Sequence, residues 1–301
     1  MDAAASTHSV SAAVREGAVR RVLSLFKLRI GVVIMATALA GAIVTPGAGL
    51  SAAQWVVLAL SVLVASACAG AFNQYVEYES DRLMARTRSR AFVTGALRHG
   101  PAWLVLIGVL VALAVAAAWF SLNAMAALFV FLGAFFYAVV YTVWLKRRTA
   151  MNIVIGGLAG SFAVLAGAAA VDPSPQVLPL LFALVLFLWT PPHFWSLAIA
   201  CRDDYVAAGV PMLPVVVGTP RAARVVLVST VLLVAVSIVP AFTGLGAWYL
   251  GGALVGGAFF LWRAWQLARA PSRATALASF HASLLQLSLL LVAAGVDVLL
   301  A

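Results

Sequence analysis

Five long stretches of this chain contain almost no charged residue, and this feature constrains its fold more than any other. Lys, Arg, Asp and Glu are absent from residues 30–76, 99–145, 225–262 and 274–296, and only Asp172 interrupts residues 149–201. A helix that crosses a membrane needs about 20 apolar residues. The four longer stretches therefore have room for two helices each, and the last has room for one. Turn residues divide the longer stretches at 45–47, 121–123, 172–175 and 243–246.

Helices are the expected structure because hydrocarbon offers no hydrogen-bond partner to a bare backbone. We therefore predict an all-α polytopic membrane protein, a bundle of nine transmembrane helices. The composition agrees, since 65% of the residues are hydrophobic and only 9% are charged, whereas soluble domains are about half apolar and about a quarter charged. This composition excludes a water-soluble enzyme, a coiled coil and a nucleic-acid-binding domain, despite a net charge of +10.

The basic residues predict how the bundle is oriented. All nineteen Lys and Arg residues precede the first expected span or follow the second, fourth, sixth or eighth, so they lie on one side. The positive-inside rule places that side in the cytoplasm, or in the matrix of an organelle. We expect an integral protein of a bacterial inner membrane, with its N-terminus and active site cytoplasmic and its C-terminus on the opposite side. Most of the arginines are then topology signals, and they also contact anionic lipid.

The chain is expected to form one folded unit. Residues 1–25 are predicted to be a disordered, basic cytoplasmic tail, because the first 14 are mainly small and polar. Residues 26–301 are predicted to be a single transmembrane domain. Cys68 and Cys201 lie in or beside apolar stretches, which does not indicate a disulfide framework.

Five of the nine acidic residues gather in two short windows on the basic side. In the first window, Asn73, Glu77 and Asp81 follow the spacing i, i+4, i+8, which aligns their oxygens on one helix face. Mg²⁺ commonly takes one or two carboxylates together with water and phosphate oxygens. The alternative is a solvated loop balanced by the arginines that follow. Because acidic residues are so scarce at a membrane boundary, we favour a functional site.

The second window, Asp203 and Asp204, follows the sixth expected span. Alone it is a weak indication, since a helix-terminal surface pair explains it equally well. Together the two windows can face each other across a bundle and hold two or three Mg²⁺ ions around one diphosphate. The predicted metal-binding and catalytic residues are Asn73, Glu77, Asp81, Asp203 and Asp204. The basic residues expected to bind the diphosphate are Arg29, Arg86, Arg90, Lys146, Arg147 and Arg202.

Three motifs resemble a known family. The first window, Asn73-x3-Glu77-x3-Asp81 followed by Met84-x-Arg86-Thr87, resembles the first aspartate-rich motif of the UbiA-type intramembrane prenyltransferases. Residues 141–157 and 189–217, the latter beginning WTPPHFW, further resemble the protohaem IX farnesyltransferases (haem O synthases) of that superfamily. The resemblance runs from about Lys27 to the C-terminus, and residues 189–217 are its most specific part.

The resemblance implies an activity and its partners. A farnesyl group would pass from farnesyl diphosphate to a vinyl group of haem B, with addition of water and with Mg²⁺ as cofactor, giving haem O and diphosphate. The expected partners are these two substrates, membrane lipids, and haem A synthase or terminal oxidase assembly proteins. No nucleic acid is expected.

The same resemblance suggests an acceptor site at His193, Tyr141 and Trp189. His193 would be a haem iron ligand or an anchor for the porphyrin. Alternatively, Pro191 and Pro192 break the sixth span, and His193 hydrogen-bonds to the backbone that they free. The aromatic residues that could face an allylic cation are Tyr75, Tyr78, Tyr141 and Trp189.

Two other functions stay open from the sequence. The first is a UbiA-type prenyltransferase that acts on another aromatic or tetrapyrrole acceptor, against which residues 189–217 argue. The second is a transporter or channel. Transporters place charged residues near the middle of the membrane, whereas this chain places its acidic windows at one face.

Overall fold

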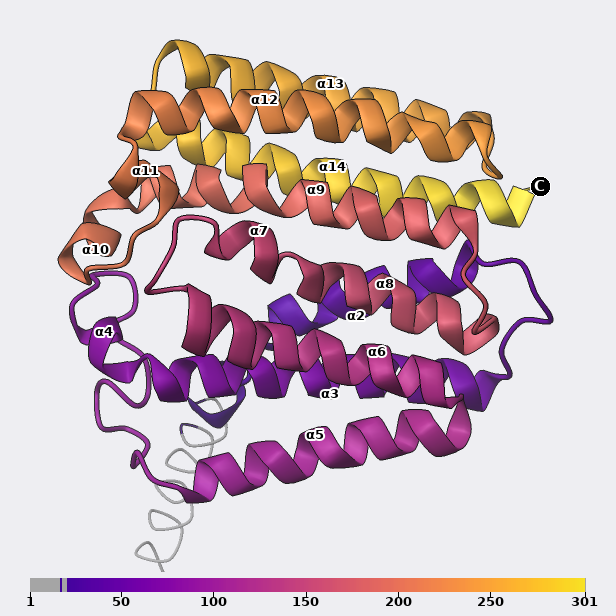
Figure 1. Ribbon diagram of the computed structural model, residues 1–301, viewed down its shortest axis with the longest axis horizontal. Coiled ribbons are helices and arrows are strands. Elements are labelled where there is room, and N and C mark those ends of the chain that lie inside the picture. Colours follow the sequence, from indigo (N-terminus) through magenta and orange to yellow (C-terminus); the bar gives the residue numbers. More distant parts are fainter. Residues whose placement is uncertain (1–16, 18–20, 301) are drawn as a thin grey trace, which may run out of the picture.

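The computed structural model describes residue 17 and residues 21–300, and it arranges them as a bundle of helices that run side by side (Figure 1). The elements are, in chain order, α2 (Leu28–Ile43), α3 (Ala52–Val76), α4 (Tyr78–Arg82), α5 (Ala102–Ser121), α6 (Ala124–Phe135), η1 (Phe136–Leu145), α7 (Asn152–Gly156), α8 (Leu158–Val171), α9 (Val177–Ala200), α10 (Arg202–Ala207), α11 (Leu213–Val216), α12 (Thr219–Ile238), η2 (Val239–Phe242), α13 (Ala247–Arg269) and α14 (Arg273–Leu300). The described residues contain no strand, which confirms the all-α prediction. Most of the tail predicted for residues 1–25 lies outside them. Its last five residues, 21–25, are helical, and Leu25 is fully buried.

Each segment predicted to span a membrane is a helix. Seven helical segments in the described part of the chain are long and apolar enough to cross a membrane. The other two expected spans are α2, which has only 16 residues, and α13, which contains Arg263 and Arg269. The count of nine is therefore approximate. The predicted turns all separate consecutive helices.

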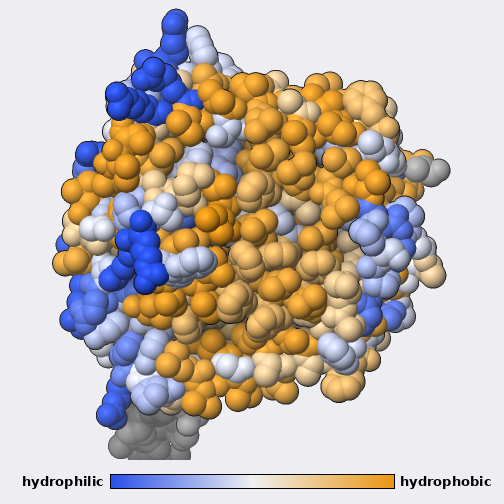
Figure 2. Space-filling view, viewed as in Figure 1, coloured by the Kyte–Doolittle hydropathy of each residue, from blue (hydrophilic) through white to orange (hydrophobic). Residues whose placement is uncertain are grey.

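The surface has the character of a membrane protein. Figure 2 shows a broad hydrophobic band across the middle of the face in view, with hydrophilic residues concentrated toward its two ends. Large apolar side chains such as Phe120 and Leu299 are more than four-fifths exposed, which a soluble protein would avoid. The loops around α4, α10 and α11 lie together at one end of the bundle (Figure 1). The chain is therefore an integral membrane protein. The loops that contain its two acidic windows lie at the same end of the bundle.

Helices α2 and α8 cross at very short range because glycines line the crossing. A Cβ atom at Gly41 would overlap the backbone of Val164, and a Cβ atom at Gly167 would overlap the backbone of Ala38. Small residues are the usual means by which membrane helices approach closely, since lipid gives no hydrophobic drive for association. The crossing fixes α2 beside α8 within the bundle.

The prediction that Pro191 and Pro192 break the sixth span is wrong. α9 continues as one helix from Val177 to Ala200, with both prolines inside it. Each proline removes the backbone hydrogen bond to the carbonyl four residues earlier. The hydroxyls of Thr190 and Ser196 bond to other carbonyls of the same helix, those of Leu186 and Pro192. α9 is also packed against α8, α12 and α14, and tertiary packing of this kind overrides helix propensity.

Candidate active site

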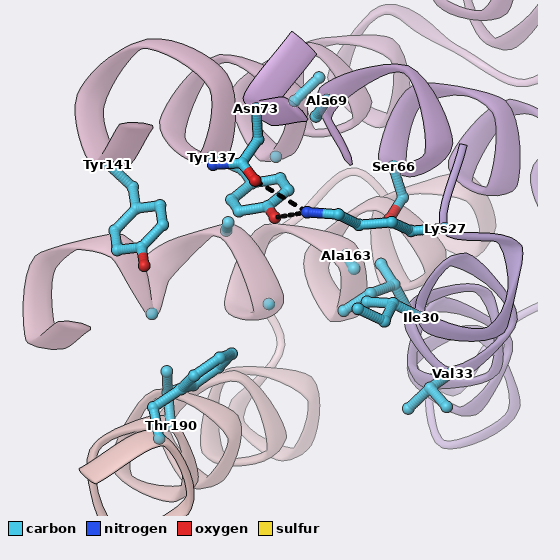
Figure 3. A pocket seen from close by; sticks show the side chains of 18 of the residues that line it. Lys27, Ile30, Val33, Ser66, Ala69, Asn73, Tyr137, Tyr141, Ala163 and Thr190 are labelled. Carbon is cyan, nitrogen blue, oxygen red and sulfur yellow. Dashed lines mark hydrogen bonds between the residues drawn. The ribbon is translucent and has the colours of Figure 1, made fainter. Parts of the chain in front are cut away.

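A cavity of about 320 Å³ lies between the helices, and it has a polar end and an apolar body. The polar end is at the level of the α3–α4 junction. The apolar body is lined mainly by small and aliphatic side chains of α2, α3, α6, α8 and α9. Figure 3 shows Lys27 extending across the cavity toward Asn73 and Tyr137. Such a cavity suits a ligand with a charged head and an apolar tail.

Asn73, Glu77 and Asp81 all line the polar end, as their spacing predicts. α3 ends at Val76 and α4 begins at Tyr78. Glu77 is the junction, yet the backbone register continues through it. The Glu77 N–H donates to the Asn73 carbonyl at 3.0 Å, and the Asp81 N–H donates to the Glu77 carbonyl at 2.8 Å. The three side chains are almost fully buried, so they face the cavity and not bulk solvent.

Two lysines hold the first two of these side chains. The Lys27 Nζ donates to the Asn73 Oδ1 at 2.8 Å and lies 3.4 Å from the Tyr137 hydroxyl. The Lys146 Nζ donates to the Glu77 Oε2 at 2.6 Å. In addition, the Asn73 Nδ2 donates to Glu77. The side-chain oxygens of Asn73 and Glu77, which are the candidate metal ligands, therefore each accept a hydrogen bond from a lysine.

Asp81, the third candidate metal ligand, has a hydrogen-bond partner for only one of its two carboxylate oxygens. Arg90 donates to its Oδ2, while its Oδ1 is buried and has no hydrogen-bond partner among the residues that the structure describes. A buried carboxylate oxygen without a partner is costly, and a hard cation would satisfy it. In the described part of the chain, no three His, Cys, Asp or Glu side chains gather closely enough to hold a metal by themselves. Glu77 and Asp81 thus fit a Mg²⁺ ion that completes its shell with phosphate oxygens.

Lys27 and Tyr137 are site residues that the sequence reasoning did not assign, and Lys27 is the more unusual of the two. Its backbone has a φ of 47°, and among the described residues it is the one non-glycine with a positive φ. Such strain persists where the surroundings enforce it, often at functional sites. The Lys27 stem packs beside Gly70, where an added Cβ would lie at ordinary van der Waals distance, 3.4–3.7 Å, from it. Burial, and then the charges of Arg90 and Lys146, lower the pKa of Lys27 to about 7.

A widened helix turn presents the aromatic side of the polar end. η1 is a π-helix that continues α6, and such segments are rare and frequent at functional sites. It stacks Tyr137 on Tyr141 with ring centroids 5.8 Å apart. Gly156 makes room for Tyr141, since a Cβ there would collide with the ring. Both tyrosines line the cavity, as does Trp189.

The second acidic window meets the loop that follows the first. The Asp204 Oδ1 accepts the Ala85 N–H at 2.8 Å, and the Arg86 guanidinium donates to the Tyr205 hydroxyl at 3.0 Å. Arg86 and Tyr205 line the cavity. Asp203 instead points to solvent, with its side chain 99% exposed. The two acidic windows therefore lie at one site. The second window contacts it through Asp204 and the neighbouring Tyr205, and not through Asp203.

Three of the six predicted diphosphate-binding residues line the cavity: Arg86, Arg90 and Lys146. The other three lie outside its lining. Arg29 and Arg147 are exposed, and Arg202 is paired with Asp203 at 3.5 Å.

Of the three residues predicted to bind the acceptor, two line the cavity and one does not. Tyr141 and Trp189 line the cavity, whereas His193 does not. His193 stacks between Trp189 and Phe280, and its Nδ1 lies 2.6 Å from the Ser283 hydroxyl. Its partner is thus a side chain of α14 and not backbone freed by the prolines. Tyr75 and Tyr78, which were cation-facing candidates, stack on either side of His99.

Comparisons with known proteins identify the family of the chain. The model of the UbiA prenyltransferase family matches residues 34–290. Protoheme IX farnesyltransferase 2 of Paramagnetospirillum magneticum is 56% identical over 278 residues, which cover 92% of this chain and 96% of the relative.

Solved structures are similar in fold. A UbiA homolog from Aeropyrum pernix superposes with a TM-score of 0.71 at 21% identity, covering 91% of this chain and 98% of that one. A UbiA homolog from Archaeoglobus fulgidus bound to DMAPP and Mg²⁺ has a TM-score of 0.65 at 15% identity, covering 88% and 97%.

Proposed function

The chain belongs to the UbiA prenyltransferase family, and on that premise we propose that it transfers a farnesyl group from farnesyl diphosphate to a vinyl group of haem B. Water adds in the same reaction, and the products are haem O and diphosphate. The observation that carries this proposal is the 56% identity to a protoheme IX farnesyltransferase across nearly the whole of both chains. Family membership also decides against a transporter or channel.

The polar end of the cavity suits a diphosphate. Lys27, Lys146 and Arg90 now contact the oxygens of Asn73, Glu77 and Asp81. When a diphosphate enters, these cations exchange those oxygens for phosphate oxygens. They then stabilise the negative charge that grows on the leaving group, which is a large term in such reactions.

The freed carboxylates of Glu77 and Asp81 would hold Mg²⁺. When bound, this ion supplies further positive charge to the departing diphosphate. The partnerless Oδ1 of Asp81 supports this assignment, and the Archaeoglobus homolog is bound to Mg²⁺. Asp204 supports the site through the loop it fastens, whereas the exposed Asp203 has no contact that ties it to the cavity.

The apolar body protects the reactive intermediate. As the carbon–oxygen bond breaks, its electron pair leaves with the diphosphate and an allylic cation forms. Tyr137, Tyr141 and Trp189 line the cavity and offer π faces to a cation, and the apolar walls keep bulk water away. The vinyl group attacks the cation, its neighbouring carbon takes a hydroxyl group from water, and one proton is released.

We assign the acceptor to the side of the cavity formed by Trp189. His193 stacks on Trp189 from outside the cavity lining, so we assign it to positioning that wall in place of the haem contact that the sequence suggested. The protein would act in a bacterial inner membrane with the cavity opening on the cytoplasmic side. Its product would pass to haem A synthase or to terminal oxidase assembly.

The test is to identify the product. Membranes that contain the protein are supplied with farnesyl diphosphate, Mg²⁺ and either haem B or 4-hydroxybenzoate, and the extracts are examined by mass spectrometry. We expect a hydroxyethylfarnesyl haem that is absent from membranes without the protein, and no prenylated benzoate. A prenylated benzoate without a haem product would refute the proposed acceptor.

A further inference from the structure

Helix α14 packs against α9 and contributes Leu287 to the cavity lining. One turn earlier on α14, Ser283 is completely buried and contacts two side chains of α9. Its backbone carbonyl accepts the Trp189 indole N–H at 2.9 Å, and its hydroxyl lies 2.6 Å from the His193 Nδ1. One residue of α14 therefore holds both the indole that lines the cavity and the imidazole stacked on it.

The hydrogen bonds around Ser283 determine which ring nitrogen of His193 carries the proton. A serine hydroxyl has one hydrogen, and Ser283 donates it to the Phe280 carbonyl at 2.6 Å. The contact between Ser283 and His193 is then donated by the imidazole, so the Nδ1 is protonated. Because a charged ring is costly among buried apolar side chains, the imidazole is neutral and its Nε2 carries no proton.

The same contacts restrict the orientation of both rings. His193 stacks on Trp189 with ring centroids 4.1 Å apart and on Phe280 with centroids 4.5 Å apart. Turning the imidazole over would replace the N–H beside Ser283 with a C–H and leave a buried N–H without its acceptor, which is costly. The indole N–H of Trp189 is already bonded to Ser283, so the part of the indole that lines the cavity offers an apolar surface only.

We propose that Ser283 is a positioning residue for the acceptor, which holds His193, and through it the Trp189 indole, in the orientation that a flat aromatic acceptor requires. The inference rests on the proposed function, because it assumes that the acceptor lies against Trp189. The attraction between aromatic rings depends on their relative orientation. A tilted indole therefore weakens acceptor binding, while the diphosphate end of the cavity keeps its contacts.

The test is Ser283→Ala, which removes the hydroxyl but keeps the carbonyl to which Trp189 bonds. Formation of haem O is measured with haem B varied at saturating farnesyl diphosphate and Mg²⁺, and then with farnesyl diphosphate varied at saturating haem B. The KM for haem B should rise about fivefold, which corresponds to one neutral hydrogen bond. The KM for farnesyl diphosphate should change less than about twofold. Neither KM depends on how much of the variant folds.

The matched control is Ser279→Ala. Ser279 lies one turn before Ser283 on α14, is also completely buried, and its hydroxyl contacts that of Ser196 on α9 at 2.9 Å. Neither Ser279 nor Ser196 lines the cavity, so the control removes an equivalent contact between the same two helices. Both KM values should stay within about twofold of the wild type. An equal rise of the haem KM in both variants, or an unchanged haem KM in Ser283→Ala, would overturn the proposal.

A second measurement needs no substrate. Nitrogen-15 NMR of protein labelled at histidine reports which ring nitrogen is protonated, and the His193 signals are those lost in His193→Phe. The wild type should show a neutral ring protonated at Nδ1, as should Ser279→Ala, whereas Ser283→Ala should lose this preference. Protonation at Nε2 in the wild type would contradict the proposal. If the wild type forms no haem O, the proposed acceptor is wrong, but the spectra still decide whether Ser283 holds His193.

Discussion

Asp81 and Asp203 carry the same carboxylate in opposite environments. Asp81 is fully buried, is paired with Arg90 and has one oxygen without a partner. Asp203 has a side chain that is 99% exposed. A charge in water interacts weakly with its neighbours, whereas the same charge in a closed site acts strongly. Only Asp81 is therefore expected to matter for the reaction.

We predict that Asp81→Asn lowers kcat/KM for farnesyl diphosphate by about 100-fold or more, because it removes the proposed metal ligand and the charge that pairs with Arg90. The shape of the side chain is retained, so the protein should stay folded. The matched change Asp203→Asn should alter kcat/KM less than about twofold. Haem O formation at several Mg²⁺ concentrations measures both. Wild-type turnover by Asp81→Asn would refute the metal assignment.

Lys27 and Arg29 lie two residues apart, but their environments differ as much as those of Asp81 and Asp203. Lys27 reaches the cavity and contacts Asn73, while Arg29 is exposed. A hydrogen bond to a charged group contributes about 1.5–3 kcal/mol, which corresponds to roughly 10- to 100-fold in affinity. Lys27→Gln should raise the KM for farnesyl diphosphate by that factor, and Arg29→Gln should leave it nearly unchanged. Equal effects in steady-state assays would show that Lys27 does not bind the diphosphate.

The sequence identifies the acidic residues of the site more readily than the basic ones. Only nine acidic residues occur in the chain, so Glu77 and Asp81 are conspicuous, and both line the cavity. All nineteen basic residues have a sufficient explanation as topology signals. Nothing in their pattern distinguishes Lys27 from Arg29, because the difference arises from the left-handed backbone of Lys27 and from the hydrogen bond of its side chain to Asn73. Those are properties of the packed chain.

At the scale of the helix, α8 carries two glycines with opposite surroundings. A Cβ at Gly167 would overlap the backbone of Ala38, whereas a Cβ at Gly160 would meet nothing within 4 Å. Alanine is otherwise favoured over glycine in a helix by about 1 kcal/mol. The collision should dominate at Gly167 and the helix propensity at Gly160.

We therefore predict that Gly167→Ala destabilises the protein by about 1–3 kcal/mol or more, while Gly160→Ala is neutral or stabilising. Thermal unfolding in detergent, followed by size-exclusion chromatography, measures both variants side by side. If Gly167→Ala were as stable as the wild type, α2 and α8 would not cross as closely as described.

The lengths of the charge-free stretches locate the helices because membrane thickness sets a helix length. Their partners and irregularities follow from other causes. The π-helix η1 places Tyr137 and Tyr141, and no residue in 136–145 identifies it in advance. The continuity of α9 through Pro191 and Pro192 depends on neighbouring helices that hold it from several sides. Local sequence cannot report such tertiary contacts.

At the scale of the whole molecule, the basic residues and the site belong to one end. The loop of residues 83–101 and the loop of residues 172–176 lie at opposite ends of the bundle (Figure 1). The first loop carries four of the nineteen basic residues and the second carries none. Because Lys and Arg are retained on the cytoplasmic side during insertion, the first loop and the polar end of the cavity should face the cytoplasm.

Paired serine-to-cysteine variants test this orientation. Ser89 and Ser174 are exposed, one in each loop, and Cys201, which is half-buried, is first replaced by serine. A maleimide that cannot cross membranes should label Ser174→Cys in intact cells and Ser89→Cys only after the membrane is opened. Neither change alters a charge, so the topology signals stay as they are. The reverse labelling pattern would place the diphosphate site outside the cytoplasm, where it would lack the pool of prenyl diphosphate that the proposed reaction requires.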